Sequence, residues 1–174
     1  MPEPQKDTWL KLVVLTVIVL ALVAGFSALK AIDAATKSRI YAVREAQEWQ
    51  DYQVESNKKD NYGMNRDILE SLRHMEARGA KIAKSLAAKI KAYEDEMTRL
   101  NQERDQIKTR AQILATQEQT LEKQAGKFGL AVVLLQLAIM SSAVAALSKK
   151  KILWLLGLGL GAWGLVYVGL ALMI

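Results

Sequence analysis

Two long apolar runs at the C-terminal end of the chain constrain the fold more than any other feature. Residues 128–147 and 152–174 are almost entirely apolar, and only Ser148, Lys149, Lys150 and Lys151 separate them. A helix of about 20 apolar residues is long enough to cross the hydrocarbon core of a bilayer. Because the connection is so short, the two runs predict an antiparallel hairpin of transmembrane helices with a basic loop at residues 148–151.

A third apolar run lies near the start of the chain. Residues 12–29 contain only Thr16 and Ser27 as polar members, and Trp9 and Lys11 precede them. A signal peptide also begins with basic residues and an apolar run, but its apolar core is usually shorter. The sequence therefore predicts a polar tail at residues 1–8 and a transmembrane helix at residues 9–32.

The middle segment, residues 33–127, is highly charged, and charges of both signs are interspersed along it. The net charge of +6 is therefore not gathered into a basic patch, and the sequence predicts no nucleic-acid partner. Helix-forming residues predict two helical arms joined near Gly79, since a glycine after a basic residue is typical of a helix end. The alternative is a turn near Gly63. If the apex lies near Gly79, residues 57–65, which are rich in Asn, Asp and Gly, are predicted to form a kink or short loop within the first arm.

Apolar side chains recur every seventh residue along the returning arm. Such spacing predicts a heptad seam. The regular row consists of Leu86, Tyr93, Leu100, Ile107, Leu114, Leu121 and Phe128. A second, less apolar row consists of Ile90, Met97, Arg104, Ala111, Glu118 and Ala125. Two arrangements fit this pattern: the seam packs on the outgoing arm of the same chain, or it forms a coiled coil between chains.

The basic loop at residues 148–151 predicts the orientation in the membrane, because the preference for cytoplasmic lysines is strongest in short loops. It places this loop and the N-terminus in the cytoplasm and residues 33–127 on the other side. A second group of basic residues favours the reverse orientation: Lys30, Lys37, Arg39, Lys123 and Lys127. Long segments cross membranes largely regardless of charge, so the short loop decides the prediction.

The predicted spans contain small and polar residues that point to helix packing. No Asp, Glu, Lys, Arg or His lies inside the apolar runs at 12–29, 128–147 and 152–174, which argues against an ion-coupled transporter. Gly157, Gly161 and Gly164 form a strip that allows another helix to approach closely. Gln136 lies near the middle of its span, where it is predicted to find a hydrogen-bond partner on another helix or to line an oligomeric pore.

No catalytic, cofactor-binding or metal-binding residue is predicted. The chain has no cysteine and a single histidine, His74, and it lacks nucleotide-binding and hydrolase motifs. The acidic cluster at residues 94–96 points around the helix circumference and predicts a solvated face. The sequence therefore predicts a protein that is not an enzyme and needs no cofactor.

A short motif follows the first span. It reads W-x-x-Y-Q-x-x-S-x-K and consists of Trp49, Tyr52, Gln53, Ser56 and Lys58. It resembles the signature of a bacterial membrane-protein family known as domain of unknown function 4337, whose layout is also similar. The resemblance implies a location in the bacterial inner membrane. Residues 33–127, which the basic loop places outside the cytoplasm, are then expected in the periplasm. It implies no activity, but it makes the five motif residues candidates for structural or partner contacts.

Together these patterns predict an all-α membrane protein. Three transmembrane helices, at residues 9–32, 128–147 and 152–174, are joined by a long extramembrane helical hairpin or coiled coil at residues 33–127. The expected function is a homo-oligomeric structural or scaffolding assembly in the lipid bilayer. The alternatives are a subunit of an oligomeric pore and an adaptor that binds another membrane-protein complex.

Overall fold

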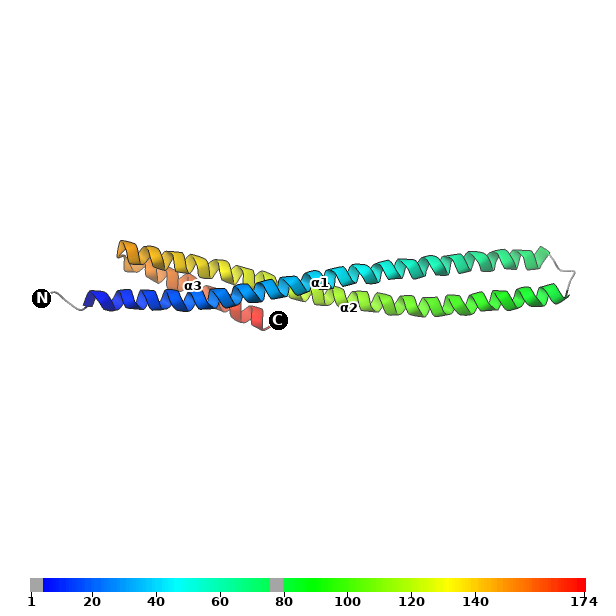
Figure 1. Cartoon of the computed structure of the whole chain (residues 1–174), viewed down its shortest axis with the longest axis horizontal. Helices are drawn as coiled ribbons and strands as arrows, with labels where there is room; N and C mark the ends of the chain where they lie inside the picture. The colour runs from blue at the N-terminus through cyan, green and yellow to red at the C-terminus, as the bar shows by residue number, and fades with distance from the viewer. Residues whose placement is uncertain (1–4, 76–79) are drawn as a thin grey trace. The chain divides into compact units, whose positions relative to one another are not determined.

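The chain folds into three α-helices, and a computed structural model describes residues 5–75 and 80–174 of it (Figure 1). The helices are α1 (Gln5–Met75), α2 (Ala80–Ser148) and α3 (Lys151–Leu172). No strand occurs among these residues. The prediction of an all-helical chain with three helices long and apolar enough to cross a membrane is confirmed. The predicted apex near Gly79 lies outside the described residues.

The predicted kink or short loop at residues 57–65 is wrong, because α1 stays helical through this segment. Gly63 has no positive φ, and a Cβ built on it would lie 3.7 Å from Cε of Met97 on α2. Helix propensity differs by less than about 1 kcal/mol for Asn, Asp or Gly relative to Ala. Packing against α2 therefore outweighs the local preference of these residues for turns.

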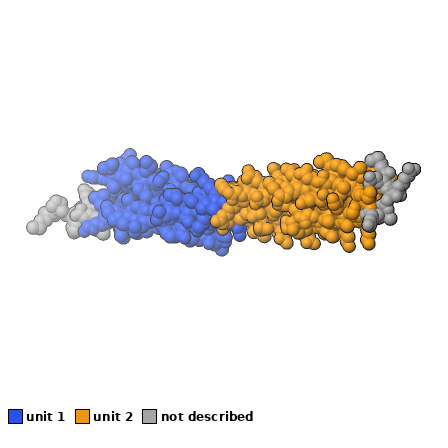
Figure 2. Space-filling model, turned by 45° about the vertical axis from the view of Figure 1, so that its right-hand side comes forward, with its two compact units in different colours: residues 1–40, 117–174 blue, residues 41–116 orange. Residues whose placement is uncertain are grey.

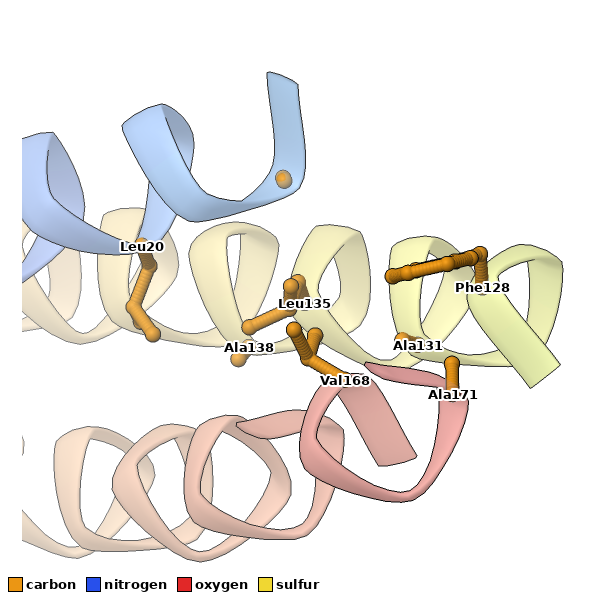
Figure 3. Close-up of a cluster of buried hydrophobic side chains, with 8 residues drawn as sticks. Leu20, Phe128, Ala131, Leu135, Ala138, Val168 and Ala171 are labelled. Atoms are coloured by element: carbon orange, nitrogen blue, oxygen red, sulfur yellow. The ribbon is translucent and has the colours of Figure 1, made fainter. Parts of the chain in front are cut away.

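The structure divides into two compact units (Figure 2). Unit 1 comprises Met1–Ile40 and Gln117–Ile174, so it contains the apolar parts of all three helices. Its core combines alanines with a few large side chains, and Figure 3 shows Leu135 of α2 close to Val168 of α3. The cluster consists of Leu20, Ala24, Phe128, Ala131, Leu135, Ala138, Val168 and Ala171. The alanines allow the helix backbones to approach closely, as in helix packing inside membranes.

Unit 2, Tyr41–Thr116, pairs the charged parts of α1 and α2 as antiparallel helices. The order of contacts shows this direction, since Tyr62 meets Tyr93 while Tyr52, earlier in α1, meets Arg104, later in α2. The buried apolar side chains described in this unit all come from α2, and they are Ile90, Leu100, Ile107 and Ala111. The α1 half of the contact is built differently, as described below.

The turn between α2 and α3 is short. Helix α2 ends at Ser148, and Lys149 adopts a left-handed conformation with φ of 55°. Such a residue is a common way to end a helix, although glycine usually occupies it. Lys150 is extended and accepts a hydrogen bond from the backbone N–H of Leu153, which starts α3.

Candidate functional site

The glycine strip of α3 packs against the other two helices of its own chain. Gly157, Gly161 and Gly164 are buried. A Cβ built on Gly157 would lie 2.7 Å from Oγ of Ser142, and one on Gly161 would lie 3.0 Å from Cδ2 of Leu20. A Cβ on Gly164 would lie 3.0 Å from Cγ of Leu135. The strip is thus occupied within unit 1, and contacts with any other molecule must use different surfaces.

Polar side chains also join the helices of unit 1. The indole N–H of Trp154 donates a hydrogen bond to Oγ1 of Thr16 (3.3 Å), which links α3 to α1. The hydroxyl of Ser141 donates to the carbonyl of Leu153 (2.8 Å), and Nε2 of Gln124 donates to the carbonyl of Ala171 (3.1 Å). Polar groups in an apolar environment need such partners, because an unpaired group costs free energy there.

Gln136 does not take part in the interhelical hydrogen bonds described above for Trp154, Ser141 and Gln124. Its side chain is exposed on the outside of unit 1, on the same side of α2 as the exposed Val133, Leu137 and Met140. The predicted interhelical partner of Gln136 is absent from the hydrogen bonds described within the chain. An amide therefore stands on an otherwise apolar surface.

In unit 2 the heptad seam of α2 faces α1 of the same chain. Ile90, Leu100 and Ile107 are buried, and the other predicted residues of this unit are partly buried: Leu86, Tyr93, Met97 and Leu114. The rings of Tyr93 and Tyr62 lie 5.6 Å apart. Leu121 is also partly buried, but it belongs to unit 1. Of the two arrangements that the spacing allowed, the described contacts are those of packing within one chain.

The matching face of α1 was missed from sequence because most of its residues are polar. Partly buried residues recur at alternating spacings of four and three, the heptad rule, but they include charged side chains and tyrosines. One row is Tyr41, Glu48, Glu55, Tyr62 and Leu69, and the other is Glu45, Tyr52, Lys59 and Arg66. A search for heptad spacing in tyrosines, rather than in aliphatic residues alone, could have found it.

Contacts across this interface are correspondingly polar. The guanidinium of Arg104 lies 5.3 Å from the centre of the Tyr52 ring, a cation–π contact. Nη1 of Arg110 on α2 lies 3.9 Å from Oε1 of Glu48 on α1. Nε of Arg104 and Oε2 of Glu55 are buried without a hydrogen-bond partner in the described part of the chain. Arg104, one of the two charged residues in the second heptad row, thus lies against a tyrosine of the facing helix.

The five motif residues divide between two sides of α1. Tyr52 and Ser56 are partly buried, whereas Gln53 and Lys58 are exposed. Trp49 lies at the border of exposure, its ring edge-on to Tyr52 at 5.6 Å, and its indole N–H donates to Glu45 (3.1 Å). Lys58 donates to Glu55 (2.6 Å). The motif thus places Tyr52 against α2 and Gln53 on the exposed surface.

Comparison with protein families agrees with the motif. A family model described as Domain of unknown function (DUF4337) matches residues 9–174. The chain belongs to this family. The resemblance inferred from residues 49–58 is thereby confirmed, and it extends over essentially the whole chain. Comparisons with curated proteins and with solved structures found no match.

The charged groups of this DUF4337 chain make ordinary surface pairs. The carboxylate of Glu55 accepts a hydrogen bond from the ammonium group of Lys58 and thereby raises the pKa of Lys58. Asp67 accepts a hydrogen bond from Arg66 and raises the pKa of the guanidinium in the same way. Arg99 pairs with Glu96 and Glu103 on its own helix. Exposed pairs of this kind contribute little to stability. Within the described residues, no group of three or more His, Cys, Asp or Glu side chains could hold a metal ion.

Proposed function

We propose that this DUF4337 chain is an integral membrane protein that forms a homo-oligomeric structural assembly without enzymatic activity. The membrane location is supported by the apolar surface of unit 1. In the most apolar 18-residue stretch of each helix, only 22% to 28% of the stretch is buried inside the structure. Large exposed apolar surfaces mark contact with a membrane or another protein. Three such segments, each long enough to cross a bilayer, favour the membrane.

The observation that carries the oligomer is the one-sided core of unit 2. Among the described residues of this unit, the buried apolar side chains come from α2, while α1 presents mainly tyrosines and charged side chains to the interface. Small units with so little apolar burial usually need oligomerisation or another form of reinforcement. The heptad spacing on both facing helices supports a coiled-coil arm, to which further copies can add.

A pore subunit is the second candidate, and Gln136 is the observation that favours it. An exposed amide on an apolar surface is costly in lipid unless it meets a polar partner or water. Equivalent Gln136 side chains from several copies could pair with one another or line a water-filled axis. The adaptor alternative shares the same exposed surface but requires a different protein as partner.

The mass of the particle tests the assembly. We expect the full-length protein, extracted in mild detergent or in native nanodiscs, to give a native mass that is a multiple of 19.3 kDa. An exclusively monomeric mass over the micromolar range would contradict both the structural assembly and the pore. Images of the particle then separate these two, since a pore requires an axis filled with water instead of lipid or protein.

We also propose that the protein lies in the bacterial inner membrane with residues 148–151 in the cytoplasm and residues 33–127 in the periplasm. The support is the lysine tip. Lys149 occupies a left-handed position where glycine would be favoured by about 1 kcal/mol or more. Lysines at this turn are therefore better explained by their charge than by turn geometry.

The orientation predicts the labelling of a single cysteine. Because the chain has no cysteine of its own, Gln102→Cys on the exposed face of α2 provides a clean reporter. We expect a maleimide that does not cross the inner membrane to label it in intact cells. Lys150→Cys serves as the opposite-side control and should react only after the cells are opened. The reverse pattern would show that the arms are cytoplasmic.

A further inference from the structure

Helix α1 carries a second heptad pattern on the side that α2 does not cover. Its central row consists of Val43, Gln50, Asn57, Met64 and Ser71. The adjacent row consists of Gln47, Val54, Asn61 and Ile68. All of these side chains are exposed, and the two rows alternate at spacings of four and three residues. We call these residues the amide stripe.

The amide stripe contains no charge, although the segment around it is rich in charged residues. Every charged residue between Val43 and Leu72 lies outside the two rows. Several of them face α2, including the partly buried Glu48, Glu55 and Arg66. A helix in a soluble arm normally turns its apolar side inward and its charges toward water. In α1 the charges are divided between the two sides, since Arg44, Asp51, Lys58, Asp60 and Asp67 are exposed beside the stripe. The two rows of the stripe are nevertheless uncharged and lack the contact that such a surface usually has.

The exposed face of α2 in the same unit shows that this neutrality is not general. There the positions opposite the buried seam are also exposed, and they follow the same spacing. The positions that match the stripe include one acidic and one basic residue, Asp95 and Arg99, and the adjacent exposed row adds Lys84, Lys91 and Asp105. This face has the mixed charges of an ordinary solvated surface. The two helices of unit 2 therefore differ in what their outer faces can bind.

We propose that the amide stripe is the surface through which a second copy of this chain binds in unit 2. The proposal rests on the proposed homo-oligomer and names its contact surface. Carboxamides donate and accept hydrogen bonds, so Gln50 and Asn57 can pair with their own counterparts. Buried Asn residues in heptad seams pair in this way and fix register and oligomeric state. Identical uncharged stripes also meet without repulsion, whereas a charged partner surface would lose hydration without finding a counter-charge.

The orientation of the two copies follows from the membrane. If both copies have the same orientation in one bilayer, their α1 helices run in parallel. Parallel heptad seams bring identical central positions opposite each other, so Asn57 of one copy meets Asn57 of the other. The apolar members Val43, Val54, Met64 and Ile68 supply burial between the amides. The stripe thereby adds the apolar contact that the facing side of α1 lacks.

Disulfide formation tests the contact directly in the full-length protein in membranes. Identical central positions of a parallel pair lie within the distance that a disulfide spans. We expect Asn57→Cys to give a covalent dimer under mild oxidation in most of the protein. Gln102→Cys, an exposed amide on α2, is the matched control and should give only background. Equal yields at both positions, or a cross-link of Asn57→Cys solely to a different protein, would overturn the proposal.

A pair of isosteric charge changes provides an independent test. Gln47→Glu with Gln50→Glu places like charges in the stripe without altering side-chain size, and should weaken self-association about tenfold or more. Gln102→Glu with Gln106→Glu makes the same change on the exposed face of α2 and should leave the native mass unchanged. Helical content by circular dichroism verifies that all variants fold.

The outcomes separate this inference from the proposed function. Dissociation of the stripe variant alone supports the stripe. If the wild type is an oligomer and the stripe variant is too, or if both variants dissociate equally, the stripe is overturned but the assembly is kept. A monomeric wild-type protein overturns the assembly and the stripe together.

Discussion

Gly157→Leu is expected to destabilise unit 1 severely. A Cβ at this position would lie 2.7 Å from Oγ of Ser142 and 3.0 Å from the backbone carbonyl oxygen of Ala138. The carbonyl belongs to the α2 backbone and cannot rotate away, so α3 must move outward to accommodate the larger side chain. Overpacking usually costs about 1–3 kcal/mol, and displacement of a helix raises this cost. Thermal unfolding in detergent, followed by tryptophan fluorescence, measures the loss.

Gly159→Leu is the matched control because it makes the same substitution two residues away. Nothing lies within 4 Å of a Cβ built on Gly159. Its effect should remain within about 0.5 kcal/mol, as for other exposed substitutions. If the two variants unfold at the same temperature, the close contact between α2 and α3 at Gly157 is not the native one.

Phe128→Ala is expected to be the most destabilising truncation in the same core. Phe128 is 1% exposed and lies in the cluster with Leu20, Leu135 and Val168 (Figure 3). Removal of a buried phenylalanine ring costs about 3–5 kcal/mol, because it leaves a cavity as well as losing apolar contact. Chemical or thermal unfolding of the detergent-solubilised protein should show this loss.

The other phenylalanine of the chain supplies the comparison. Phe26 is 47% exposed, so Phe26→Ala should cost much less than Phe128→Ala. Phe128→Leu should fall between Phe128→Ala and the wild type, since it leaves a smaller cavity. An effect of Phe128→Ala no larger than that of Phe26→Ala would argue against the described core.

The sequence was sufficient to predict the features that repeat over long stretches. Three apolar runs and uninterrupted helix formers indicated three helices, and the seventh-residue recurrence from Leu86 located the face of α2 that contacts α1. The strip at Gly157 indicated close packing, although not that its partners lie in the same chain. These patterns can be recognised from the sequence alone because each depends on many residues at once.

Other features could not be predicted because they depend on tertiary contact. Residues 57–65 combine several turn-forming residues, yet each costs a helix little, and contact with α2 keeps them helical. The inner face of α1 was hidden because charged residues usually mark a solvated face, whereas here they are partly buried against α2. The polarity of Glu48, Glu55 and Arg66 therefore suggested a surface where the structure has an interface.

The two hydrogen bonds between α2 and α3 have a consequence for motion. One joins Ser141 to the carbonyl of Leu153 near the start of α3, and the other joins Gln124 to that of Ala171 near its end. A piston-like slide of α3 by one residue, about 1.5 Å, would strain both bonds at once. The last helix is thus held along its axis near both ends, so these bonds oppose axial sliding of α3 against α2.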